Sequence, residues 1–143
     1  MAIEGGCQCG QVRYRLNAPL AKAYACHCGQ CQKQTASAFS LAVPITFSDL
    51  ELTGDLHTVS WEAPSGATGT GYFCPACGSR LFHRSSRSPH GAMLKAGTLD
   101  DTAGITPACH LWVSRKLPWI VLDPDVPAYA EQPADLKAWR ALL

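Results

Sequence analysis

Apolar and polar residues alternate in short segments along the chain, and this spacing is the main guide to its secondary structure. Val12, Tyr14 and Leu16 alternate with two arginines, which is the period of a half-buried β-strand. Similar extended segments are expected at residues 21–26, 38–43, 50–52, 57–61, 70–73, 92–96 and 108–114. Gly and Pro separate these segments at fairly regular intervals. The pattern therefore predicts a mainly β chain.

Two short helices are expected beside the strands. Residues 30–35 are polar and have good helix propensity. Near the C-terminus, Leu136, Trp139 and Leu142 recur at helical spacing, and Pro133 suits a first turn, so a helix is predicted within residues 132–143. Residues 122–132 are expected to form an extended connector. No internal repeat or linker is visible, so a single domain over residues 1–143 is predicted.

Composition and charge narrow the class of protein. Apolar residues make up 47% and charged residues 16% of the chain, which suits a globular protein. The apolar runs are too short to cross a bilayer, so no membrane association is expected. Net charge is +1 and the basic residues are scattered, so no nucleic-acid partner is expected. The first residues lack a basic and an apolar region typical of a secretory signal, which predicts a cytoplasmic location.

Closely spaced cysteines are the strongest chemical signal in the sequence. Seven of the eight fall into three groups: Cys7 and Cys9; Cys26, Cys28 and Cys31; and Cys74 and Cys77. Close pairs of thiols bind one ion well, whereas disulfides usually join segments that are distant in sequence. In a reducing compartment this pattern favours zinc over disulfides. Cys109 stands alone and is given no role, because a free cysteine is commonly a small buried apolar residue.

One four-thiolate zinc site is predicted from two of these groups. Cys74 and Cys77 form a C-x-x-C turn followed by Gly78, and they supply two ligands. Cys7 and Cys9 lie between glycines that suit a tight ligand turn, and they are the natural second pair. Four protein ligands leave no position for a substrate, so this site is interpreted as structural. In an alternative pairing, Cys74 and Cys77 would instead join two cysteines of the central group.

The central group offers only three thiolates. Three protein ligands and one open position are typical of catalytic zinc. The alternative is a second structural site, completed by a distant ligand. Candidates for that ligand are His110, Cys109, His83 and His27, of which His110 is preferred.

The motifs together resemble the glutathione-dependent formaldehyde-activating enzyme family, which also includes centromere protein V. The resemblance rests on GGCQCGQVRY at 5–14, CHCGQCQKQTASAF at 26–39, FCPACGSRLF at 73–82, AGTLDD at 96–101 and HLWVSRKLPW at 110–119. It implies a β-tent fold of antiparallel sheets and two zinc ions per chain. It also implies that Cys7, Cys9, Cys74 and Cys77 hold structural zinc, and that Cys26, Cys28 and Cys31 hold catalytic zinc. The chain departs from the family motif at Ala36, where glycine is usual.

The resemblance further implies a carbon–sulfur lyase that joins glutathione and formaldehyde into S-hydroxymethylglutathione, or that acts on a related thiol and aldehyde. The alternative is a zinc-stabilised binding or chaperone-like module without catalysis. Substrate contacts are expected among residues near the open zinc or on the same face of a strand: Lys33, Thr35, Ser37 and His110. Arg80, Arg115 and Lys116 are candidate partners for a glutathione carboxylate. For Thr35 and Ser37, a capping or turn hydrogen bond is the competing interpretation.

Overall fold

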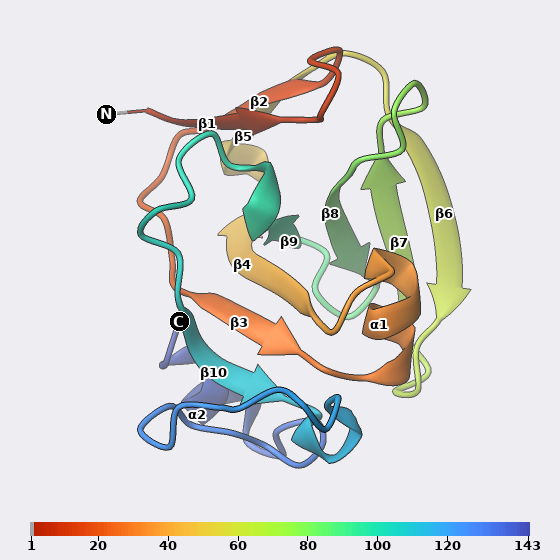
Figure 1. Cartoon of the computed structure of the whole chain (residues 1–143). Coiled ribbons are helices and arrows are strands. Elements are labelled where there is room, and N and C mark those ends of the chain that lie inside the picture. The colour runs from red at the N-terminus through yellow and green to blue at the C-terminus, as the bar shows by residue number, and fades with distance from the viewer. Residues whose placement is uncertain (1) are drawn as a thin grey trace. The chain divides into compact units, whose positions relative to one another are not determined.

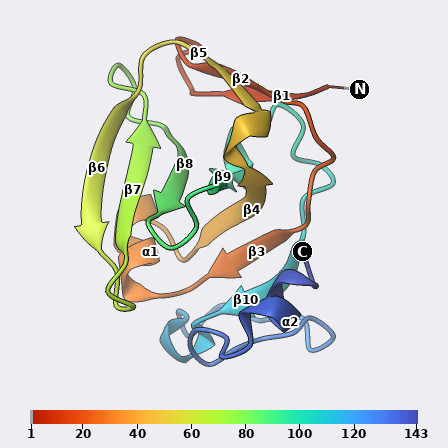
Figure 2. The same ribbon diagram turned by 180° about the vertical axis from the view of Figure 1, so that it is seen from behind.

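A computed structural model describes residues 2–143 of the chain, and its contacts group these residues into two compact units. The first unit contains residues 2–21 and Val43–Gly104, and the second contains Lys22–Ala42 and Ile105–Leu143. The single domain expected from the sequence stays a prediction. Figures 1 and 2 show the elements from opposite sides. No helix within residues 2–143 is long and apolar enough to cross a membrane.

Seven strands lie wholly in the first unit and form two antiparallel groups (Figure 1). The smaller sheet has the order β1-β2-β5, with β1 Ile3–Gly6, β2 Arg13–Leu16 and β5 Leu50–Thr53. The other group has the order β9-β8-β7-β6, with β6 His57–Glu62, β7 Thr68–Phe73, β8 Arg80–Ser85 and β9 Gly91–Lys95. Two 3₁₀ turns, Phe47–Asp49 and Ala96–Thr98, lie between strands. This unit therefore consists almost entirely of strands and turns.

Strand β1 was not expected, because glycine usually weakens a strand. The structure shows why glycine is needed at position 5. A Cβ atom there would lie 2.2 Å from the Tyr14 hydroxyl and 2.3 Å from the Thr98 carbonyl oxygen. The Tyr14 hydroxyl is hydrogen-bonded to Thr98 Oγ1 at 2.9 Å, so the backbone of β1 passes directly over a part-buried polar contact. Packing that is specific to this fold thus overrides the intrinsic preference of Gly5.

The second unit contains two complete strands, the beginning of a third and both α-helices. Its elements are β3 Ala23–Cys26, α1 Gly29–Thr35, the start of β4 Ser40–Thr46, β10 Pro107–Leu111, the 3₁₀ turn Val113–Arg115 and α2 Leu136–Arg140. Strand β3 pairs with β4 in antiparallel orientation and with β10 in parallel orientation. The mainly β fold with a short C-terminal helix is confirmed, and β3–β10 adds a parallel pair to the antiparallel pattern that was expected.

The C-terminal helix is shorter than the range predicted from the sequence. Asp135 is its N-cap, and the Asp135 carboxylate accepts a hydrogen bond from the Ala138 amide at 2.9 Å. The helix therefore begins after Asp135, and Pro133 lies outside it instead of in its first turn. Trp139 fixes the helix to the unit: its ring packs edge-on against Tyr24, and its Nε1 donates to Cys109 Sγ at 3.2 Å. Cys109 is fully buried at this contact.

Strand β10 ends earlier than its alternating sequence suggests. Trp112 has a φ of +58°, a left-handed conformation that breaks the strand after Leu111. Ser114 then falls in a 3₁₀ turn. The extended segment predicted at residues 108–114 therefore ends at Leu111.

Helix α1 ends on a residue with an unfavourable backbone conformation. Ala36 has φ +50° and ψ +38°, and its amide bonds back to the carbonyls of the last helical turn. This left-handed cap is a position where glycine is preferred, because a side chain costs about 1 kcal/mol there. Alanine in place of the usual glycine at position 36 thus lowers the stability of the segment that carries the central cysteines.

Replacing Ala36 with glycine is expected to increase the free energy of unfolding by about 0.5–1 kcal/mol, because it relieves this strain. Ala38 is a matched control, since it is an alanine two residues away whose φ is not positive. Ala38→Gly should destabilise the protein, because it adds chain entropy without relieving strain. Urea denaturation of both variants measures the difference, and an equal loss of stability in both would contradict the explanation.

Candidate metal centres

Four cysteines from distant parts of the first unit converge at one point. Cys7 follows β1, Cys9 lies in the turn before β2, and Cys74 and Cys77 lie in the turn between β7 and β8. Their four Sγ atoms all lie within 4.8 Å of one another. The structure thus brings together the two pairs that were expected to share a site.

The spacing of these sulfur atoms fits a tetrahedral metal ion. Cys7 Sγ lies 3.5 Å from Cys9 Sγ, and Cys9 Sγ lies 3.7 Å from Cys74 Sγ. Four thiolates around zinc, each at about 2.3 Å, would be separated by about 3.8 Å along each tetrahedral edge. The eight cysteines all lie within residues 2–143, and none of them is held in a disulfide. This group could therefore hold a zinc ion without a large rearrangement.

Backbone turns hold the four-cysteine group in place. The Val12 amide donates to Cys7 Sγ at 3.3 Å, and the Cys7 amide donates to the Val12 carbonyl at 3.0 Å. In the other turn, the Gly78 amide donates to the Cys74 carbonyl at 2.8 Å. Gly78 has a φ of +76°, a left-handed conformation that glycine adopts without steric cost. Both turns thus direct sulfur atoms inward by local hydrogen bonds.

Ser79 is a functional residue that sequence reasoning missed. Its Oγ lies 3.3 Å from Cys77 Sγ and accepts a hydrogen bond from the Gln8 amide at 3.1 Å. The hydroxyl therefore links the two cysteine turns. Hydrogen bonding by Ser79 lowers the pKa of Cys77 to about 5, which favours the thiolate form that a metal requires. A serine two residues after a cysteine is too common in sequences to indicate this role.

The ionisation of Cys9 shows why this group needs a cation. The Gln11 amide favours the Cys9 thiolate, but burial and the three neighbouring cysteines outweigh it and raise the pKa of Cys9 to about 12. Adjacent thiols cannot all lose their protons at neutral pH, because the negative charges repel one another. A divalent cation offsets that repulsion and allows all four to bind as thiolates.

The second group of cysteines lies where β3 leads into α1. Cys26 is the last residue of β3, Cys28 is the N-cap of α1, and Cys31 lies in its first turn. Their Sγ atoms lie within 4.8 Å of one another, and Cys28 and Cys31 are partly exposed. Among residues 2–143, the group contains no fourth Cys, His, Asp or Glu. The three-thiol arrangement expected from the sequence is thus present.

Sulfur takes the place of the oxygen that usually caps a helix. The Cys31 amide donates to Cys28 Sγ at 3.3 Å, as it would to the side chain of a serine or aspartate cap. Hydrogen bonds from Cys26 and Cys31 lower the pKa of Cys28 to about 2, whereas Cys28 and Cys31 raise the pKa of Cys26. As in the first group, full ionisation requires a cation.

Neither of the histidines considered as a fourth ligand in this unit belongs to the three-thiol group. His27 is fully buried, and its Nε2 is hydrogen-bonded to His110 Nδ1 at 3.0 Å. His110 lies on β10 opposite Ala25 of β3. The two rings bridge the parallel strand pair beside the cysteine loop. Burial lowers the pKa of both histidines, so both are neutral at pH 7.

Gln32 fixes the cysteine loop, a role that no motif in the sequence indicates. Its Nε2 donates to the His27 carbonyl at 2.9 Å and to the Arg115 carbonyl at 2.8 Å. Thr35 has a similar structural contact, since its hydroxyl donates to the Cys31 carbonyl at 2.7 Å. This bond matches the capping interpretation of Thr35. Side chains of α1 thus hold the backbone around the second cysteine group.

A groove of about 640 Å³ runs along one side of α1. It is lined by residues of α1 and of the segments that follow α1 and β10: Gly29, Gln32, Lys33, Ala36, Ser37, Ala38, Arg115, Leu117 and Trp119. Two of the predicted substrate contacts, Lys33 and Ser37, line it, whereas Thr35 and His110 do not. Trp119 is 74% exposed, an unusual state for so large an apolar side chain. The groove therefore combines positive charge with an accessible aromatic surface.

The fold and the cysteine geometry define a small, mainly β protein with two clusters of cysteine side chains that are suited to binding metal ions. The family described as "Glutathione-dependent formaldehyde-activating enzyme" matches residues 2–115 of the chain. The chain belongs to this family. It is 30% identical to a Halomonas elongata protein named "Putative glutathione-dependent formaldehyde-activating enzyme", over 86% of this chain and 82% of that protein.

A solved structure supports the fold. The crystal structure of a Rhodobacter sphaeroides protein matches with a TM-score of 0.54, covering 73% of this chain and 91% of that chain. Its sequence identity is 24%, so the likeness concerns the fold alone. The resemblance noted in the sequence motifs is confirmed at the level of the family.

Proposed function

We propose that this chain is a zinc-dependent carbon–sulfur lyase that forms S-hydroxymethylglutathione from glutathione and formaldehyde, or acts on a closely related thiol. Membership of the family supports glutathione and formaldehyde as the substrates. The observation that carries the proposal is the difference between the two cysteine groups. One has four thiols, and the other has three and no fourth protein ligand among the described residues.

The four-cysteine group would hold a structural zinc ion. Its sulfur spacing matches a tetrahedral site, and four protein ligands complete the coordination of zinc. An ion bound there would join two turns that are more than sixty residues apart in sequence, as the separation between Cys9 and Cys74 shows. The zinc ion in this group would therefore contribute to the stability of the fold and not to catalysis.

Cys26, Cys28 and Cys31 would hold the catalytic zinc ion. Zinc held by three thiolates supplies a position at which a substrate thiol loses its proton. The chain keeps these ligands in place through the Cys31 amide, which bonds Cys28, and through Gln32, which fixes the loop. The partial exposure of Cys28 and Cys31 supports access by a small molecule.

The groove beside α1 supports binding of the peptide part of the thiol. Lys33 and Arg115 line it and can pair with a glutathione carboxylate, while Ser37 offers a hydroxyl. The Arg115 guanidinium lies close to Gly29: its Nη2 is 3.5 Å from the position that a Cβ atom on Gly29 would occupy. Gly29 directly follows Cys28, so the guanidinium lies beside the backbone of the cysteine loop.

The proposed reaction needs no further reactant. The glutathione sulfur forms a bond with the carbonyl carbon of formaldehyde, and the carbon–oxygen π electrons move to the oxygen. The proton released from the thiol is returned to that oxygen, which gives a hydroxymethyl group without oxidation or reduction. The main task of the protein is to hold the two reactants together, which removes much of the entropic barrier.

Metal analysis and a rate measurement test this proposal together. The purified protein is expected to contain about two zinc ions per chain. With both present, it should accelerate formation of S-hydroxymethylglutathione from glutathione and formaldehyde above the spontaneous rate, as followed by exchange NMR. A protein that carries both ions and gives no acceleration would instead support the non-catalytic binding module.

A further inference from the structure

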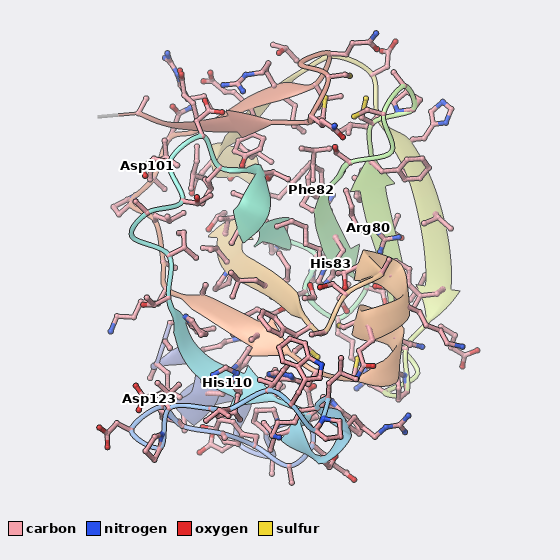
Figure 3. All side chains as sticks on the ribbon, in the orientation of Figure 1. Arg80, Phe82, His83, Asp101, His110 and Asp123 are labelled. Carbon is pink, nitrogen blue, oxygen red and sulfur yellow. The ribbon has the colours of Figure 1, made fainter. Side chains whose placement is uncertain are left out.

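Strand β6 forms an edge of the first unit. It is the outer strand of the group β9-β8-β7-β6, and both views show it there with β7 as its neighbour (Figures 1 and 2). All of its residues except Trp61 are exposed. Arg80 and His83, which contact the Trp61 ring, come from β8, on the other side of β7 (Figure 3). The outer side of β6 is therefore accessible to a partner.

The hydrogen bonds of the β6–β7 hairpin show which backbone groups face outward. At its turn, the Ala63 amide donates to the Ala67 carbonyl at 2.8 Å, whereas the next carbonyl, that of Thr68, accepts a bond from the segment after β8. Hydrogen-bonded pairs alternate with pairs whose backbone groups point away from the partner strand. The register of β6 on β7 has no shift, so the alternation continues along the strand. The N–H and C=O groups of Thr58 and Ser60 therefore point away from β7.

Apolar side chains lie along one face of this edge. Val59 and Trp61 alternate with polar residues, so they share a face of β6. Val59 is 46% exposed, and among the described residues of the first unit it is the one large apolar side chain that is exposed. Edge strands are commonly protected from pairing by lysine, proline or a bulge. The sequence of β6, HTVSWE, has neither residue, and its ladder is regular, so the strand is suited to pairing.

We propose that β6 pairs in antiparallel orientation with β6 of a second copy of the chain, about a two-fold axis at Val59. Thr58 then lies opposite the partner subunit's Ser60, and each such pair exchanges two backbone hydrogen bonds. Val59 lies opposite the partner subunit's Val59 in a non-hydrogen-bonded pair, where side chains are closest. His57 lies opposite the partner subunit's Trp61, which brings two rings together at each end.

A second copy fits this edge because the strand matches itself at every paired position. Residues with hydroxyl groups meet each other, the exposed valine meets its own counterpart, and rings meet rings. Glu62 is the one acidic residue of β6 and lies beyond the paired segment. The two Glu62 residues would lie about 20 Å apart along the strands, which exceeds the Debye length of about 8 Å. The pairing thus covers apolar surface without bringing like charges together, and it does not depend on the proposed activity.

Sedimentation velocity of the zinc-loaded protein tests this proposal. The average mass should rise from that of one chain towards that of two between about 10 µM and 1 mM, because a single strand pair makes a small interface of the weak class. Val59→Lys should raise the dissociation constant at least tenfold, since two ammonium groups then meet at the axis. Ser60→Pro should have a similar effect, because it removes an N–H that β7 does not use. Both positions are exposed, so melting curves should show folded proteins.

Val121→Lys is the matched control. Val121 is 93% exposed and belongs to the second unit, close in sequence to the exposed Trp119. This variant makes the same change of charge and apolar surface as Val59→Lys and should associate as the unchanged protein does. Association that is lost in Val121→Lys and kept in Val59→Lys would overturn the proposal and place the interface on the second unit. A protein that stays monomeric up to about 1 mM would also overturn it, and would leave the edge to an extended segment of a different protein.

Amide hydrogen exchange, followed by NMR, locates the contact. The Thr58 and Ser60 amides should exchange several-fold more slowly at high than at low protein concentration, because the dimer supplies each with a carbonyl partner. The Val59 amide faces β7 in the hairpin and is the internal control, so its exchange should change little. A dimer that forms without added protection of Thr58 and Ser60 would show that β6 is not the pairing strand.

Discussion

Replacing Cys77 with serine is expected to unfold the first unit and to release one zinc ion. Structural zinc contributes about 10–16 kcal/mol of apparent binding free energy at pH 7, whereas a whole domain is stable by about 5–15 kcal/mol. A serine hydroxyl does not replace a thiolate, and the hydrogen bond between Cys77 and Ser79 changes with it. Circular dichroism and metal analysis of the purified variant measure the loss of structure and of zinc.

Cys109→Ala is the appropriate control for this experiment. Cys109 is a fully buried cysteine that belongs to neither thiol group and contacts Trp139. Its removal should cost about 1–3 kcal/mol, because the Trp139 N–H loses its partner, and it should leave the zinc content unchanged. A Cys77→Ser protein that stays folded and keeps two zinc ions would show that the four-cysteine site is not structural.

Replacing Cys31 with serine is expected to lower activity by about a hundredfold or more while the protein stays folded. Changes in the surroundings of a metal commonly cost about 10–100-fold, and the loss of a direct ligand costs at least as much. Zinc content should fall from about two ions per chain to about one. Cys31 is partly exposed and lies in the first turn of α1, where serine is compatible with the helix.

The contrast between Cys77→Ser and Cys31→Ser is the decisive result. Thermal melting should distinguish them, since only the Cys77 variant loses its cooperative transition. The measurement is independent of the substrate, so it tests the division into a structural and a catalytic site even if the physiological thiol differs from glutathione. If both variants unfold alike, that division is wrong.

Cysteine spacing was sufficient to predict the candidate sites, because tight groups of thiols impose strong geometric limits on what can bind them. The structure brings together the same four and the same three cysteines that the sequence paired. Most strands followed from alternation for a similar reason, since half-buried strands require apolar side chains on one face. Local patterns of this kind can be identified without knowing the fold.

Features that depend on distant contacts could not be predicted in this way. Strand β1 contains Gly5, whose place is explained only by Tyr14 and Thr98 lying against it. Strand β8 was missed because the bulge at Leu81 interrupts its alternation. The early end of β10 depends on the left-handed backbone of Trp112, which is rare for a bulky residue. The roles of Gln32 and Ser79 are likewise set by tertiary contacts.

The parallel pairing of β3 with β10 has a consequence for the order in which the protein matures during synthesis. Ala25 meets His110 across this pair, so the ribosome must make some eighty-five more residues before β3 gains that neighbour. All four cysteines of the other group have been synthesised by position 77. The four-cysteine group can therefore come together before β10 has been made, whereas β3, which leads into the three other clustered thiols, gains its parallel neighbour only after β10 follows.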